Sequence, residues 1–241
     1  MGEYYNWVNV DRKEYICPSD FDMGNKLLES SAPHYEFLCS LRELIANEWS
    51  GSHILFLGDS QPLSLDENNV TIKKLYDQTV ESGHEGNGFD TVFETYKNIS
   101  GWFSGAEKDV RREIEFYLRE VEIGESDAFN EYGVDPEDPY KGLFARKGTD
   151  FRYTLNHTKK VYYSPDEIKV TLLSNGKTEV PDKKPGGLFS KSAKTSPSID
   201  PLPYLLRYGY WGTGEWVGDI IGVSDTIPEG YAPLTEITID Y

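Results

Sequence analysis

The pattern of apolar and polar residues predicts four helices between residues 24 and 124. In four segments, apolar residues recur at the three- and four-residue spacing of an amphipathic helix. These segments are about residues 35–49, 72–83, 89–99 and 107–124. Gly83 and Gly124 follow the second and fourth segments, and glycine commonly ends a helix. Ser104 and Glu107 have the spacing of a capping box, which predicts where the fourth helix begins.

A different pattern predicts strands at both ends of the chain. Residues 5–10 and 14–18 are short and largely apolar, and they flank Asp11-Arg12-Lys13, so they predict a hairpin. Residues 53–57 predict one buried strand inside the helical region. After residue 150 the pattern is typical of strands throughout. These predicted strands are a second hairpin at residues 151–164 and further strands at 168–173, 216–223 and 234–241.

The two predicted hairpins share a sequence pattern. Residues 8–18 align without gaps on residues 155–165, and an Asn, a Lys, a Tyr and a Pro coincide in the two copies. Hairpin mechanics explains each coincidence, because Asn can satisfy a turn amide and Pro ends strand pairing. The alternative is a duplicated recognition element that presents Asn and Lys to a ligand.

These patterns predict a single α+β domain over residues 1–241. An isolated hairpin is at best marginally stable, so the N-terminal hairpin must join strands contributed after residue 150. We therefore expect an antiparallel sheet, formed by the N-terminal hairpin and C-terminal strands, packed against the helical segment of about residues 24–124. Residues 182–199 are basic and rich in Pro, Gly and Ser, which predicts a loop insertion. This loop is either a solvated insertion or a flap that covers an acidic groove or partner.

The charge of the chain restricts the partners that it can bind. The sequence has 41 acidic and 24 basic residues, for a formal net charge of −17. Residues 1–150 carry 30 of the acidic side chains and 14 of the basic ones. A nucleic-acid binder needs a cationic surface to neutralise phosphates, so the composition argues against that function. It favours a basic protein as the partner.

The cellular compartment and the cofactors can be predicted from signals and motifs that the sequence does not contain. The first residues resemble no secretory signal, and no apolar run approaches the ~18 residues of a membrane span. We therefore expect no membrane contact. Two cysteines make no disulfide framework, so we also expect a cytosolic protein. Known metal-ligand spacings and phosphate-binding glycine loops are missing, so we expect neither a metal nor a cofactor.

One segment resembles a catalytic motif. Ile54-Leu55-Phe56-Leu57-Gly58-Asp59-Ser60 is similar, over about seven residues, to the first block of the GDSL (SGNH) hydrolases. The resemblance implies that Ser60, directly after Asp59, is a nucleophile whose own main-chain amide serves the oxyanion hole. It also implies an Asp-x-x-His base near the carboxyl terminus, and this sequence has none. The histidines are His34, His53, His84 and His157.

Two groups of residues are candidates for binding a partner. Tyr208, Trp211 and Trp216 lie in a glycine-rich aromatic segment, which indicates either core packing or a recognition surface. Carboxylates are concentrated at Asp135, Glu137 and Asp138, without the ligand order of a calcium loop.

Two functions from different classes remain open. The first is a non-enzymatic interaction protein, such as an immunity-type inhibitor whose acidic face docks a basic toxin or nuclease. The second is a small hydrolase that uses Ser60 or a pair of carboxylates. The net charge could also serve solubility alone. The sequence indicates no oligomeric state.

Overall fold

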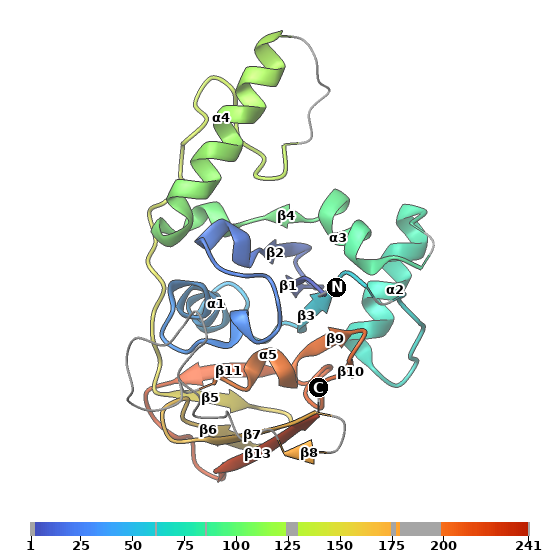
Figure 1. Cartoon of the computed structure of the whole chain (residues 1–241), viewed down its shortest axis with the longest axis vertical. Coiled ribbons are helices and arrows are strands. Elements are labelled where there is room, and N and C mark those ends of the chain that lie inside the picture. Colours follow the sequence, from blue (N-terminus) through green and yellow to red (C-terminus); the bar gives the residue numbers. More distant parts are fainter. Residues whose placement is uncertain are drawn as a thin grey trace.

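Strand β1 lies in the middle of a six-stranded sheet in the computed structural model of the chain (Figure 1). The structure describes residues 3–60, 62–84, 86–123, 130–174, 177–178 and 199–240. The strands of the main sheet follow the order β10-β9-β3-β1-β2-β4. Their bounds are β1 Tyr5–Asn9, β2 Glu14–Ile16, β3 Ile54–Gly58, β4 Lys97–Asn98, β9 Arg207–Gly209 and β10 Gly212–Thr213.

The main sheet confirms the α+β fold and the contribution of both ends of the chain. β1 pairs antiparallel with β2 and β3, as the hairpin prediction requires. The sheet is mixed, however, and not purely antiparallel as predicted. β2 pairs parallel with β4, and β3 pairs parallel with β9. Each parallel pair joins strands that are far apart in sequence, and parallel neighbours require such long crossover connections.

The two faces of β1 serve two separate hydrophobic cores. Tyr5 and Trp7 belong to the larger core, which also contains the buried face of helix α1, Glu36–Ala46. Val8 belongs to the smaller core, which packs against α2, Val70–Ser82, and α3, Gly88–Thr95. Successive side chains of a strand point to opposite faces, so a fully buried strand must supply apolar residues to both.

The four predicted helices are present, but the first and third end earlier than predicted, and α1 ends at Ala46 instead of near residue 49. Asn69 caps α2 by accepting from the amides of Thr71 and Ile72, and Gly83 ends it at φ 81°. The third helix stops at Thr95 instead of continuing to residue 99, because the chain turns into β4. Short helical turns complete the set. They are α5 Leu202–Leu205 and the 3-10 turns Pro18–Phe21, Glu29–Ser31, Ser100–Trp102 and Ser104–Ala106.

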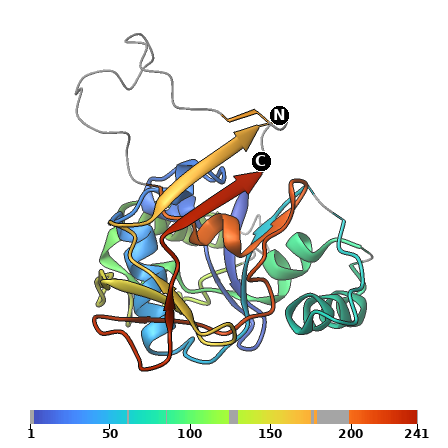
Figure 2. The ribbon, with the colours of Figure 1, turned by 90° about the horizontal axis from the view of Figure 1, so that it is seen from below.

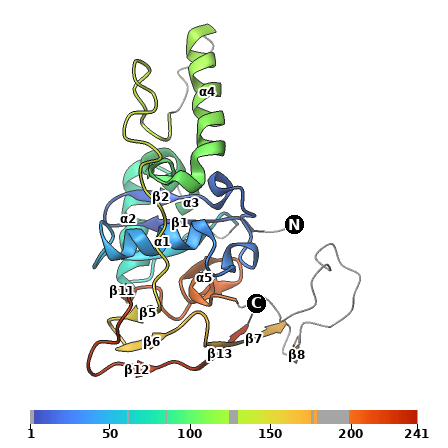
Figure 3. The ribbon, with the colours of Figure 1, turned by 90° about the vertical axis from the view of Figure 1, so that its left-hand side faces the viewer.

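Helix α4, Glu107–Ile123, starts differently from the prediction and projects from the body (Figures 1 and 3). Ser104 opens a 3-10 turn that has no side-chain cap, so the expected capping box does not form there. The Glu107 carboxylate instead accepts from Arg111 Nε at 2.8 Å. The expected stop at Gly124 lies outside the described residues. No helix in the described ranges combines the length and apolar character needed to cross a membrane.

The other strands after residue 150 form two smaller sheets at the end of the molecule opposite α4 (Figure 3). One is ordered β11-β5-β6-β12, and the other β13-β7-β8, in which β7 and β13 lie side by side (Figure 2). The predicted strand at 216–223 is shorter than expected, because Trp216 and its neighbours form a turn before β11. The bounds are β5 Tyr153–Asn156, β6 Val161–Tyr163, β7 Lys169–Ser174, β8 Lys177–Thr178, β11 Ile221–Ser224, β12 Ala232–Pro233 and β13 Glu236–Asp240. Residues 182–198 of the predicted basic loop lie outside the described residues.

The shared hairpin pattern has a local explanation. Asn9 Oδ1 accepts from the amides of Asp11 and Arg12, and Asn156 Oδ1 accepts from the amide of Lys159. Lys13 and Lys160 both take left-handed backbone angles, at φ 55° and 53°. Each asparagine therefore closes a four-residue turn, and each lysine occupies the turn's left-handed position. These contacts favour hairpin mechanics over a duplicated recognition element.

A buried ion pair fastens α1 to the segment before α5 and to β6. Arg42 and Asp200 are fully buried, and Arg42 Nη2 donates to Asp200 Oδ2. The Tyr163 hydroxyl donates to Asp200 Oδ1 at 2.6 Å, and the Leu202 amide donates to the same oxygen at 3.0 Å. Arg42 Nη1 also reaches Asp150 Oδ1 at 3.4 Å. The charge of Arg42 is thus balanced inside the chain.

We expect Asp200→Asn to lower the free energy of unfolding by about 3–5 kcal/mol, because it leaves the Arg42 guanidinium buried without its main counter-charge. Urea denaturation of the purified chain measures the loss. Asp166→Asn is the matched control, because Asp166 is an exposed partner of His34, and its effect should stay within about 0.5 kcal/mol. A loss below about 1 kcal/mol in Asp200→Asn would contradict the assignment.

Candidate functional site

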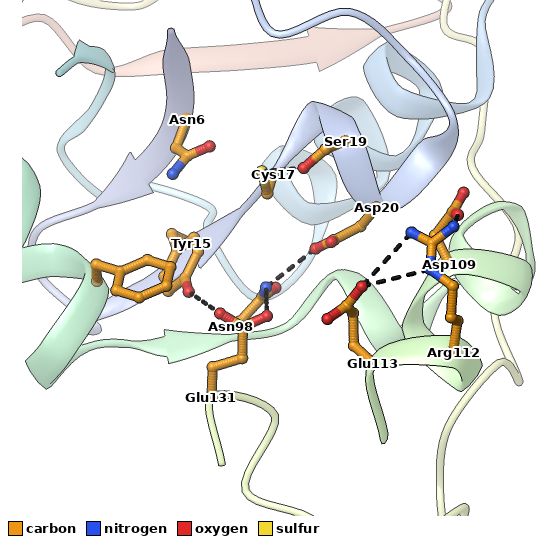
Figure 4. A pocket seen from close by; sticks show the side chains of 11 residues that line it. Asn6, Tyr15, Cys17, Ser19, Asp20, Asn98, Asp109, Arg112, Glu113 and Glu131 are labelled. Carbon is orange, nitrogen blue, oxygen red and sulfur yellow. Dashed lines mark hydrogen bonds and ion pairs between the residues drawn. The ribbon is translucent and has the colours of Figure 1, made fainter. Parts of the chain in front are cut away.

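A cavity of about 260 Å³ lies beside β2, between α4, β4 and the 3-10 turn Pro18–Phe21 (Figure 4). Four carboxylates and a single guanidinium are among its lining side chains. The lining residues are Asn6, Tyr15, Cys17, Ser19, Asp20, Phe93, Asn98, Asp109, Arg112, Glu113 and Glu131. A second hollow, of about 450 Å³, lies against α2, and none of its lining residues is acidic or basic. The first cavity is therefore the candidate site.

The register of the main sheet brings the polar side chains of the site together. Trp7 pairs with Ile16, so the next position along the hairpin places Asn6 opposite Cys17. Tyr15 pairs with Asn98 across the parallel β2–β4 contact. The 3-10 turn after β2 then carries Asp20 into the interior, where only 7% of it stays exposed.

Two carboxylates share one amide at the centre of the site. Asn98 Nδ2 donates to Asp20 Oδ2 at 3.0 Å and to Glu131 Oε1 at 3.3 Å (Figure 4). The Tyr15 hydroxyl donates to Glu131 Oε2 at 3.0 Å, and the Tyr132 hydroxyl donates to Asp20 Oδ1 at 3.2 Å. All of these donors are neutral. Among the described residues, neither carboxylate forms an ion pair.

The guanidinium in the lining is already engaged by two other acids. Arg112 Nη1 lies 2.9 Å from Asp109 Oδ1, and Arg112 Nε lies 3.4 Å from Glu113 Oε1. Asp109 is buried, so this contact balances one internal charge. The charge of Asp20 and Glu131 is left without a matching cation in the described part of the chain.

Burial shifts the protonation of two groups in the site. Burial raises the pKa of Asp20 to about 6, and the nearby Glu131 acts in the same direction, although hydrogen bonds from Asn98 and Ser100 oppose the rise. Burial also raises the pKa of the Cys17 thiol to about 12. Cys17 therefore stays a thiol at neutral pH and is a poor nucleophile. Asp20 is ionised for the most part at neutral pH and takes up a proton under mildly acidic conditions.

The arrangement is suited to holding a positively charged group. A buried carboxylate without a cation is costly, and it is relieved either by a proton or by a cationic ligand. Within the described ranges, no three His, Cys, Asp or Glu side chains are grouped so that they could hold a metal ion. A cationic group that brings N–H donors would match these oxygen acceptors.

Among the described residues, neither Ser60 nor Asp59 is hydrogen-bonded to a histidine ring. The Ser60 hydroxyl donates to Asp59 Oδ1 at 2.8 Å, and Asp59 Oδ1 also accepts from the Tyr4 amide. All four histidines lie in the described residues, and each has another partner. His34 contacts Asp150 and Asp166, His53 contacts Asp11, His84 contacts Glu94, and His157 contacts Tyr231.

The predicted aromatic group is divided between core and surface. Tyr208 is buried on β9, and its hydroxyl accepts from the Ser64 amide at 3.1 Å. Trp216 is buried against Tyr163, with ring centres 6.0 Å apart. Trp211 is 53% exposed in the turn between β9 and β10. Of the three residues, only Trp211 presents a large exposed surface.

The predicted acidic group Asp135, Glu137 and Asp138 lies in an exposed turn that follows Asn130. Asp135 Oδ1 accepts from the Glu137 amide at 2.9 Å, and the Asp135 carbonyl accepts from the Asp138 amide. These carboxylates do not line the cavity. They add negative charge to the loop that also carries Glu131.

Sequence reasoning did not find the central residues of the site. Asp20 and Glu131 are separated by more than a hundred positions, and no linear motif joins them. One signal was present, because Asn6 is a polar residue in the otherwise largely apolar run of β1. A buried polar side chain in such a strand indicates either a hydrogen-bonded structural role or a site.

Comparisons of the chain with protein-family models, with curated proteins and with solved structures find no match. The function is therefore inferred from the residues of the chain itself.

We expect stability to depend on pH through Asp20. Folding raises its pKa, so its contribution is complete below about pH 4 and is lost as the pH rises through about 6. Between these limits, the unfolding free energy of the wild type should fall by about 3 kcal/mol relative to Asp20→Asn. Urea titrations across this range provide the measurement. Parallel curves for the two proteins would contradict the shifted pKa.

Proposed function

We propose that this protein is a non-enzymatic interaction module that docks a basic partner protein, as an immunity-type inhibitor of a toxin or nuclease would. The observation that carries the proposal is the pair Asp20 and Glu131, which share the Asn98 amide and have no cationic partner among the described residues. A cation supplied by another molecule would balance them.

The charge of the whole chain supports the same proposal. A molecule with a net charge of −17 attracts a cationic partner over long distances and speeds their encounter. The exposed carboxylates of Asp135, Glu137 and Asp138 stand on the same loop as Glu131. This loop would meet the partner first, and the cavity would then receive one of its basic side chains.

A cytosolic location is part of the proposal. Cys17 and Cys39 are both free thiols, and burial raises the pKa of each. Thiols of this kind persist in a reducing compartment. An inhibitor located there would protect the cell that makes it from a basic enzyme.

Neutralising the exposed loop should slow association with the partner. We expect the triple variant Asp135→Asn, Glu137→Gln, Asp138→Asn to bind the partner about tenfold more slowly, with little change in dissociation. The partner is first isolated by capture at low ionic strength, identified, and purified. Surface plasmon resonance then compares wild type and variant over a range of salt concentrations.

The matched control replaces three acids in or near the smaller sheets, Asp225→Asn, Glu229→Gln and Glu236→Gln, which changes the net charge equally. If both triple variants slow binding to the same extent, the loop has no special role. A captured partner that is acidic, or that binds equally well at high salt, would contradict the proposed function.

A small serine hydrolase centred on Ser60 is the alternative. Its support is the resemblance of the segment around Gly58-Asp59-Ser60 to the first GDSL block. The Ser60 contact with Asp59 gives the hydroxyl no imidazole base, and a serine hydroxyl without a base is a weak nucleophile.

We therefore expect a fluorophosphonate probe to leave Ser60 unlabelled at neutral pH. Intact-mass spectrometry of wild type and Ser60→Ala checks this result. A phosphonyl adduct in the wild type that disappears in Ser60→Ala would favour the hydrolase over the interaction module.

A further inference from the structure

We infer that the cavity beside β2 binds a guanidinium group, so that the partner inserts an arginine side chain there. The inference rests on the proposed function, because it names the chemical group that the docking partner contributes. The site is formed by the carboxylates of Asp20 and Glu131, the amide of Asn6 and the ring of Tyr15.

Asn6 provides an observation that is independent of the acidic residues. Its side chain lines the cavity and is only 5% exposed. In Figure 4 its amide faces the cavity, and no hydrogen bond joins it to another residue drawn there. Among the described residues, the side chain makes no hydrogen bond. A buried amide of this kind normally has a partner, which indicates that a ligand group completes the site.

The inventory of acceptors in the site fits a guanidinium. Asp20 and Glu131 provide carboxylate oxygens, and Asn6 provides an amide oxygen with no partner in the described chain. A guanidinium has five N–H donors in one plane, so it can serve several acceptors at the same time. An ammonium group has three donors on a single atom and is more strongly hydrated, so removing it from water is more costly.

The aromatic lining favours the same group. Tyr15 is buried beside the cavity, and its hydroxyl is held by Glu131, so the position of its ring is fixed. Phe93 of α3 also lines the cavity. Flat cations stack on aromatic faces more readily than ammonium groups do.

The lining of the cavity already contains one guanidinium that contacts two carboxylates. Arg112, on the lining, is held by Asp109 at 2.9 Å and by Glu113 at 3.4 Å. A second guanidinium would therefore approach Asp20 and Glu131 rather than these two acids, because Arg112 occupies them. Each guanidinium would then face its own pair of carboxylates.

Binding of a small arginine derivative to the isolated protein tests the inference. The probe is Nα-acetyl-arginine amide, and the comparison probes are the corresponding lysine and citrulline amides. We expect NMR titration to give saturable shifts of the Asn6 and Asn98 side-chain amides with the arginine probe. The lysine probe should bind at least about fivefold more weakly, and the neutral citrulline probe should not bind.

Variants of the site locate the binding. Asp20→Asn and Glu131→Gln keep the shape of each side chain and remove its charge, and each should weaken the arginine probe about tenfold. Asn6→Ala should weaken it about threefold. Glu115→Gln is the matched control, because Glu115 is an exposed acid of α4 outside the cavity, and it should bind as the wild type does.

The outcomes separate this inference from the proposed function. If the arginine probe does not bind, or if the lysine probe or calcium chloride binds equally well, the guanidinium assignment is wrong. A basic partner whose capture still depends on Asp20 and Glu131 would leave the proposed function standing. If the arginine probe binds but the cavity variants leave its affinity unchanged, the location is wrong. If every acidic variant still captures the partner as the wild type does, the proposed function is wrong as well.

Discussion

The position of β1, paired on both sides, is the constraint on which the rest of the structure depends. Its five residues are all buried, and Tyr5 and Trp7 pack into one hydrophobic core while Val8 packs into the other. Pairing with β2 fixes the residue that stands beside each side chain of the hairpin. A slip of one residue would exchange the two faces of the strand. The site depends on the same register, because it places Asn6 at the cavity.

Two buried acidic centres in this protein differ in how their charge is balanced. The charge of Asp200 is balanced by Arg42 within the chain, and Asp200 also accepts a hydrogen bond from Tyr163, so its role is structural. Asp20 has only neutral donors around it among the described residues, and burial raises its pKa to about 6. Buried ionisable groups with shifted pKa values occur most often at functional sites, where binding or catalysis requires them. This contrast is the physical basis of the proposed docking role.

The sequence predicted most of the fold because the relevant signals are local. Asn69 and Gly83 bound α2 by capping chemistry, and Asn9 and Asn156 close their hairpins by contacts within three residues. The short strands β4, β9 and β10 have no such signal, because two or three residues cannot display a period. The site was missed for a related reason. Tyr15 and Glu131 are 116 positions apart, so only the folded chain brings them together.

Glu131 has a second connection that its carboxylate does not reveal. Its main-chain oxygen accepts from the Asn98 amide at 3.1 Å, on the outer side of β4, where the main sheet ends. An unprotected sheet edge invites pairing with another chain and hence aggregation. The segment that presents the carboxylate therefore also shields the edge strand. Any rearrangement that moved this segment away from β4 would expose a template for intermolecular association. Its contact with β4 therefore protects the sheet edge whether or not the cavity is filled.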